Sequence, residues 1–239
     1  GENGPRPCRS NLWEGQGLSV ISEMWAIIAA VASGDSFEIT NALRSNSKWY
    51  LGVIVVVLVG LLVSFIYRKV PFIERHLERT IMVYSYLAIA FIIFWGVIDR
   101  FIFNNQQPWS TTIPPFLFMI MAWFGAAYNV RLRTHLSFSE FRTKMAPGGQ
   151  IICLWIDFFL WFGFALILFV TTCRLTANSA ANFQIVLGTD NTMQWWFLAT
   201  APVAALLIAG RAFQNIQEDM RKFRAGEPLI EQAVIGGDT

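Results

Sequence analysis

Few side chains in this sequence are suited to chemistry. Among 239 residues there are two histidines, His76 and His135, and three cysteines, Cys8, Cys153 and Cys173. Both histidines fall in hydrophilic segments, so no histidine pair is available within an apolar span to hold a haem. The cysteines form no CxxC motif or Cys-His cluster, so a metal site or redox motif has no support. We therefore expect no catalytic residue, no metal and no cofactor in this chain.

Charged side chains within apolar stretches are the remaining candidates, because an ionised group is costly in lipid. Asp157 lies about 12 Å along its predicted helix from the Gly-Gly pair that precedes it, at the usual rise per residue. We expect Arg131, Arg133, Arg211 or another subunit to neutralise Asp157; the alternative is that it binds an ion or a substrate. Arg100 falls at the end of another apolar span, where its long side chain can extend to the interface as an anchor.

The composition is that of an integral membrane protein. Hydrophobic residues make up 55% of the chain and charged residues 14%, which is too apolar for a soluble domain of this length. The net charge is only +2 and no basic face is evident, so we predict no nucleic-acid binding. Five apolar stretches approach the roughly 20 residues that cross a bilayer. The predicted fold is therefore an all-α bundle of five transmembrane helices, over 49–67, 81–103, 109–130, 150–172 and 195–210.

The basic residues predict how the spans are oriented. Counts of Lys and Arg in the four connections and the C-terminal tail run four, one, four, one and four. Cytoplasmic connections of membrane proteins carry the excess of Lys and Arg. Residues 68–80, 131–149 and the C-terminal tail are therefore predicted to be cytoplasmic, and the N-terminus then lies on the periplasmic side.

Several segments have the pattern of amphipathic surface helices. Residues 70–80 begin with Pro71 at a plausible first helical position. The arm 137–146 and the stretch 216–223 also carry apolar residues on one side and charges on the other. In the N-terminal segment, 18–32 has helical periodicity and is predicted to lie on the membrane or a partner; the alternative is a loosely ordered extension.

The last span carries a stripe of small residues. Ala201, Ala205 and Ala209 recur at four-residue spacing, which permits close helix contact in lipid, although alanine is also common in such helices. Pro202 lies in the middle of this span, where a kink is tolerated if neighbouring helices cover the freed carbonyl group. None of the five spans clearly shows the broken helices, inverted repeat or convergent polar residues of a transport site. The sequence thus indicates a bundle that supports something else.

Three motifs in order carry a family resemblance: DRFIFNNQQPW at the end of the second span, FGAAYNVRLRTHL at the end of the third, and AGRAFQ after the fifth. Over residues 80–217 the sequence resembles the small membrane subunit, DctQ, of tripartite ATP-independent periplasmic (TRAP) transporters. Ser137 and Ser139 depart from the family pattern, and so does the extra span within 1–79. The resemblance implies candidate subunit-interface or structural positions at Arg100, Trp109, Gly125, Arg131, Arg133 and His135.

The resemblance also implies partners. Such a subunit binds a large M subunit, a sodium-coupled permease of the elevator type, and extends its static scaffold. A periplasmic binding protein delivers an organic acid to the pair, and loops 104–110 and 175–191 are then candidate docking surface. This chain would bind neither sodium nor substrate alone, and it would lie in the bacterial inner membrane.

The predicted organisation has four parts: an N-terminal extension, 1–48; an extra helix with its connection, 49–79; a DctQ-like domain, 80–217; and a C-terminal tail, 218–239. Two other functions stay open from the residues alone. One is a membrane-anchor subunit of a respiratory enzyme, and the other is a self-contained small transporter. The first would show a haem spectrum, and the second would catalyse uptake without a partner.

Overall fold

The fold was analysed in a computed structural model, which describes residues 10–105, 107–133 and 145–227. These residues are almost entirely helical, and the described part contains no strand beyond a single antiparallel bridge between Ile185 and Met193. The predicted arm 137–146 and His135 lie mostly or wholly outside the described residues. The helices are α1 (Ser10–Ser33), α2 (Ser36–Ala42), α3 (Lys48–Lys69), α4 (Pro71–Phe101), α5 (Trp109–Leu132), α7 (Pro147–Ala181), α8 (Trp195–Leu198) and α9 (Thr200–Ala225).

Five helical segments of the described chain are long and apolar enough to cross a membrane. They are α3, α4, α5, α7 and the α8–α9 pair, with 22 to 35 residues each. At 1.5 Å per residue even the shortest of them covers about 30 Å of hydrocarbon. The prediction of an all-α membrane bundle is therefore confirmed.

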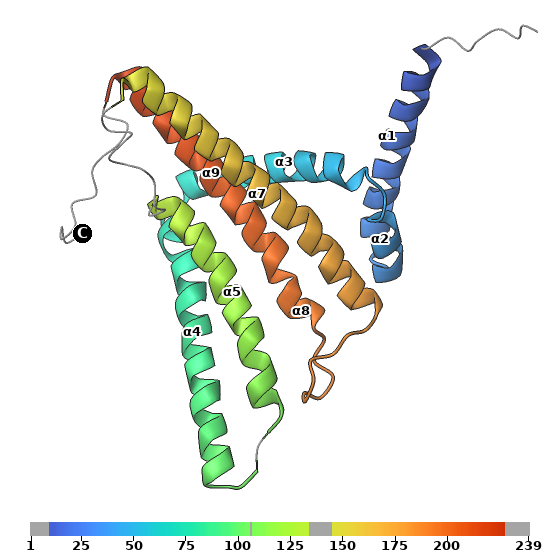
Figure 1. The fold of residues 1–239 in the computed structure, drawn as a ribbon, viewed down its shortest axis with the longest axis vertical. Coiled ribbons are helices and arrows are strands. Elements are labelled where there is room, and N and C mark those ends of the chain that lie inside the picture. The colour runs from blue at the N-terminus through green and yellow to red at the C-terminus, as the bar shows by residue number, and fades with distance from the viewer. Residues whose placement is uncertain (1–9, 106, 134–144, 228–239) are drawn as a thin grey trace, which may run out of the picture.

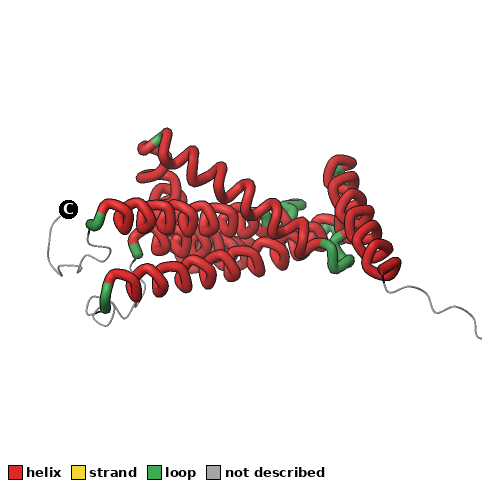
Figure 2. The backbone as a smooth tube through the Cα atoms, turned by 90° about the horizontal axis from the view of Figure 1, so that it is seen from above, coloured by secondary structure: helices red, strands yellow, loops and turns green. Residues whose placement is uncertain are grey.

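Helix α9 is the centre of the bundle. It packs against α3, α5, α7 and α8, and more than half of its apolar window is buried. Figure 1 shows α7 alongside α9 and α4 alongside α5, while α3 crosses α7 and α9 steeply. Viewed from above, α1 stands apart from the bundle (Figure 2). The core is built from α3, α5, α7 and α9 and includes Val56, Phe124, Ala127, Ala165, Ala204, Ala205 and Ile208.

Small residues allow α3 and α9 to cross closely. A Cβ atom on Gly60 would lie 3.3 Å from the Cβ atom of Ala209, and one on Gly210 would lie 2.5 Å from a methyl group of Val63. Side chains at these glycines would push the two backbones apart. Where lipid gives no hydrophobic drive for helix contact, such close packing is a main source of association.

Helices α4, α7 and α9 extend well beyond their predicted spans, and α7 continues to Ala181 instead of ending near 172. Residues 71–80 are not a separate surface helix but the first turns of α4, with Pro71 at its start as predicted. Likewise, 216–223 continues α9 without a break. In both cases no helix breaker intervenes, and the polar turns pack against neighbouring helices instead of lying alone on the membrane.

The last span is interrupted close to Pro202. Helix α8 ends at Leu198 and α9 begins at Thr200, so Pro202 lies in the first turn of α9. A proline is well tolerated there, because the first amide groups of a helix have no intrahelical acceptor. Pro202 has no N–H group to donate to the carbonyl of Leu198, four residues earlier, and the helix is interrupted at that level.

The N-terminal segment forms a helical pair beside the bundle. The predicted helix 18–32 lies within α1, and Ile27 and Ala30 form its buried face. Asp35 caps the following helix α2, which packs against α7. Glu23 accepts a hydrogen bond from the buried hydroxyl of Ser47, which joins α1 to the start of α3.

Candidate functional site

The most polar site inside the bundle centres on Arg211, whose side chain is fully buried on α9. A guanidinium group has five N–H donors, and all five have an acceptor here. Nε and Nη2 donate to the two carboxylate oxygens of Glu78, at 2.8 and 2.9 Å. Nη2 also donates to the backbone oxygen of Glu74 at 2.7 Å. Nη1 donates to Gln214 at 2.9 Å and, more weakly, to the Glu74 carboxylate at 3.4 Å.

The two glutamates reach Arg211 because of their spacing. Glu74 and Glu78 are four residues apart, so they lie on one face of α4 about one turn from each other. Glu78 is 1% exposed and lies deeper than Glu74, whose side chain is 23% exposed. A second bridge completes the link, because the amide of Gln214 donates to Glu74 at 2.8 Å.

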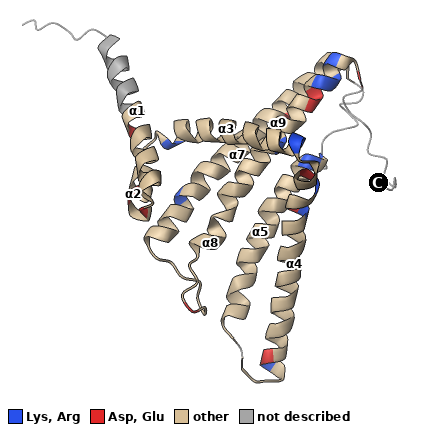
Figure 3. Cartoon of the chain, turned by 180° about the vertical axis from the view of Figure 1, so that it is seen from behind, with Lys and Arg blue, Asp and Glu red and all other residues tan. Residues whose placement is uncertain are grey.

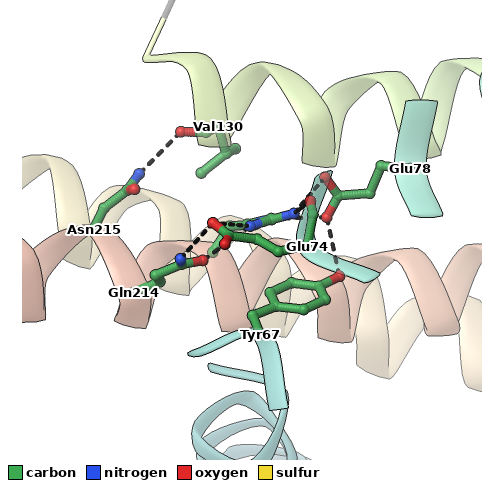
Figure 4. A network of polar contacts seen from close by, with 7 residues as sticks. Tyr67, Glu74, Glu78, Val130, Gln214 and Asn215 are labelled. Carbon is green, nitrogen blue, oxygen red and sulfur yellow. Dashed lines mark hydrogen bonds and ion pairs between the residues drawn. The ribbon is translucent and has the colours of Figure 1, made fainter. Parts of the chain in front are cut away.

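Helix α3 joins the same group through its last turns. The hydroxyl of Tyr67 donates to Glu78 at 3.1 Å, and the guanidinium carbon of Arg211 lies 4.0 Å from the centre of the Tyr67 ring. That is a close cation-π contact in a water-poor site. We call these residues the charge network: Tyr67, Glu74, Glu78, Arg211 and Gln214 (Figure 4).

The charge network makes three helices depend on one another. Taking an ion pair out of water is costly, and the cost is repaid only with good geometry and satisfied partners. The paired bonds from Arg211 to Glu78 and the stacked ring of Tyr67 meet these conditions. The donors and acceptors of the charge network bind one another, so the network fixes the positions of α3, α4 and α9 relative to each other.

A second polar contact joins α5 to α9 through Asn215, which lies one turn beyond Arg211 on the same side of α9. The amide of Asn215 donates to the backbone oxygen of Val130 at 2.9 Å, which lies in the last turn of α5. Carbonyl groups in a last helical turn have no donor within the helix, so Asn215 supplies one. Arg133 follows in a left-handed conformation at φ 53° and pairs with Asp219 at 2.7 Å.

These contacts bring the basic segments to one end of the bundle. The beginning of α4, the end of α5 and the C-terminal half of α9 meet through Glu74, Val130 and Asn215. In Figure 3 most of the Lys and Arg positions, coloured blue on the ribbon, lie at this end, with fewer at the other. The described parts of the three Lys/Arg-rich segments, 68–80, 131–149 and the C-terminal tail, therefore lie at one end of the bundle.

The structure separates the predicted site residues into several places. Arg100 is exposed and lies beside the Phe101 ring, while Trp109 is half-buried at the start of α5. Gly125 faces Met82 of α4, and the guanidinium of Arg131 lies 5.9 Å from the ring centre of Tyr128. Three further predicted residues are buried in α9: Ala201, Ala205 and Ala209.

Arg211 has other partners than the one predicted for it. It was a candidate to neutralise Asp157, yet its five N–H groups point to α4 and to Gln214. Arg133, another candidate, pairs with Asp219. Asp157 itself is half-buried on α7. The carboxylates of Glu74 and Glu78 were missed as partners because 70–80 was taken for a surface helix, although their four-residue spacing was visible.

At the opposite end, the two connections contact each other. The hydroxyl of Thr112, in the first turn of α5, donates to the backbone oxygen of Leu187 at 2.7 Å. Gly188 has φ 78°, and a Cβ atom there would lie 2.4 Å from the Cβ atom of Pro108. The segments 104–110 and 175–191, predicted as candidate docking surface, thus meet at Pro108 and Gly188, although 175–181 belongs to α7 and not to a loop.

A family model matches this bundle. The model described as tripartite ATP-independent periplasmic transporters, DctQ component, covers residues 89–222, which is more than half of the chain. The match includes α5, α7, α8, most of α9 and the C-terminal part of α4, and it contains Arg211 but not Glu74 or Glu78. The chain therefore belongs to the DctQ component family of TRAP transporters. The search of curated proteins found no match.

Membership of the DctQ family defines the class of protein to which this chain belongs. The DctQ component is the small membrane subunit of a TRAP transporter, so the protein is a transporter component. In such systems the small subunit works with a large M subunit and a binding protein. With five potential spans and this family, the protein is a multi-pass protein of the inner membrane. The respiratory-anchor alternative gains no support.

Proposed function

We propose that this chain is the static scaffold on which the large M subunit of a sodium-coupled, elevator-type transporter is held. The observation that carries the proposal is the buried centre of the bundle: α9 is tied to α3 and α4 by the charge network and to α5 by Asn215. A part that must stay still while a neighbour moves needs fixed helix positions. The transported solute would be an organic acid delivered by a periplasmic binding protein.

The outward faces favour a membrane-embedded partner. Large apolar side chains are exposed along α4 and α7, where lipid or a partner helix would cover them. On α4 these include Phe91, Phe94 and Trp95, and on α7 Ile156, Phe159 and Leu160. These outward faces form a wide apolar surface for a partner. The centre of the described bundle is filled by packed side chains.

The first experiment is purification in mild detergent. We expect a large hydrophobic M subunit to co-purify with this chain. Arg100→Gln is expected to weaken that association, since Arg100 is a proposed interface residue, whereas Arg174→Gln, at an equally exposed arginine, is the matched control. Recovery of the chain with no large membrane protein would contradict the proposal.

Reconstitution tests the transport function. The chain alone in liposomes is expected to give no sodium-driven uptake of organic acids, and uptake is expected when the M subunit and the binding protein are added. Uptake by the chain alone would support the self-contained transporter instead. A haem absorption band in the purified protein would support the respiratory anchor.

The proposed orientation has its own test. The Lys/Arg-rich end, which includes the beginning of α4 and the end of α9, would face the cytoplasm. A fluorescent protein fused to the C-terminus is expected to be bright, and a periplasmic reporter at the same position is expected to be inactive. The reverse result would invert the orientation.

A further inference from the structure

A groove at the Lys/Arg-rich end is lined by arginines from two helices. Arg68 comes from the end of α3, and Arg221 and Arg224 come from the end of α9. The groove is open and has a volume of about 520 Å³. Its described lining contains no Asp or Glu, so the three positive charges are not balanced within it. The remaining wall is partly apolar, with Trp155, Ile216 and Met220.

The groove arginines of α9 lie away from Asp219. Ile216, Met220 and Arg224 follow one another at four-residue spacing on one face of α9, and Arg221 lies beside that face; Glu218, three residues before Arg221, does not line the groove. Asp219 belongs to a different side, where it pairs with Arg133 of α5. The groove therefore presents a surplus of guanidinium donors, which suit phosphate oxygens in number and geometry.

An apolar stripe runs from the groove along α3. Phe65, Leu61 and Leu58 precede Arg68 by three, seven and ten residues, so all four share one helical face. These three apolar side chains are 58%, 41% and 62% exposed. The basic groove continues into an exposed apolar stripe on α3, and this combination suits a molecule with an anionic headgroup and a hydrocarbon tail.

Trp155 marks the level at which the two regions meet. It lines the groove at 37% exposure, and its ring packs near Phe159, one turn further along α7. Tryptophan prefers the boundary between headgroups and hydrocarbon. Basic pockets between membrane helices are known to select lipids with anionic headgroups.

We infer that this groove binds an anionic phospholipid, with its phosphate at Arg68, Arg221 and Arg224 and an acyl chain along Leu58, Leu61 and Phe65. The inference is independent of the proposed scaffold function. A bound lipid there would join the ends of α3 and α9 across the crossing that Gly60 and Gly210 make possible.

Native mass spectrometry of the full chain tests the inference, with phosphatidylglycerol and phosphatidylcholine as competing lipids. We expect the wild type to retain phosphatidylglycerol preferentially. Each basic residue near an anionic headgroup contributes about fivefold in affinity, so Arg68→Gln/Arg221→Gln/Arg224→Gln is expected to lose roughly a hundredfold. Arg224→Gln alone, near the end of α9, is expected to lose about fivefold and guards against misfolding of the triple variant.

The matched control removes the same charge elsewhere. Arg75→Gln/Arg79→Gln/Arg174→Gln alters three exposed arginines outside the groove and is expected to keep the preference. Equal retention of both lipids by the wild type would overturn the inference. So would equal losses in the two triple variants, or displacement of the lipid by inorganic phosphate, which would indicate a site for a water-soluble anion.

Discussion

Nε of Arg211 lies 2.8 Å from a carboxylate oxygen of Glu78, although 133 residues separate them in the sequence. Both side chains are almost completely buried, at 0% and 1% exposure. Arg211 belongs to the segment that the family model covers, and Glu78 precedes it. The buried guanidinium of the family-matched region is thus neutralised by a carboxylate that lies outside that region.

Breaking this pair from one side is expected to be costly. Arg211→Met leaves Glu78 buried without its cation, and such changes destabilise by about 3–5 kcal/mol. The double variant Arg211→Met/Glu78→Met is expected to recover much of this loss, because no fully buried charge is left; the remaining carboxylate, Glu74, is partly exposed and keeps its bond from Gln214. Unfolding in mixed detergent micelles measures both effects. If Arg211→Met lost no more stability to unfolding than Arg174→Met, the pair of Arg211 and Glu78 would not stabilise the fold.

The close crossing of α3 and α9 predicts that Gly210 tolerates no side chain. In Gly210→Ala the new methyl group would meet Val63 at 2.5 Å, and overpacking of this kind costs about 1–3 kcal/mol. Gly163, also within a helix, has no atom within 4 Å of the same position. Gly163→Ala is therefore the control and is expected to be neutral or to stabilise by up to about 1 kcal/mol. Thermal unfolding in detergent distinguishes them, and equal effects would argue against the crossing.

The contact between α5 and α9 predicts a local effect of Asn215. Asn215→Leu leaves the Val130 carbonyl without its donor, which is expected to cost about 1–3 kcal/mol if no water replaces the amide. The result to look for is faster amide hydrogen exchange in the last turns of α5, with α7 unchanged. Faster exchange throughout the bundle would instead indicate a global loss of stability.

The contact between the two loops predicts different outcomes at two glycines with positive φ. Gly188→Ala and Gly226→Ala share the cost of the left-handed conformation, at φ 78° and 69°. Only at Gly188 would the new methyl group overlap Pro108, at 2.4 Å. Limited proteolysis near residue 188 is expected to accelerate in Gly188→Ala, with no comparable change near 226 in Gly226→Ala. Similar behaviour at both sites would mean that the loops do not pack together.

The sequence by itself determined the class of fold, the number of spans and the family. Long apolar runs require helices in lipid, because every backbone polar group must find its partner within the segment. It also placed Pro71 at a helix start and predicted the helix within 18–32, since both depend on neighbouring residues only.

Only the tertiary structure decided which charges meet. The partner of a buried arginine depends on which helix faces it, and spacing within one helix gives no information about its neighbours. Glu74 and Glu78 looked like the polar side of a surface helix until α9 brought Arg211 against them. Arg68 of α3 likewise comes near Arg221 and Arg224 of α9 only because the two helices cross closely. Gly60 and Gly210 permit that crossing because they have no side chain.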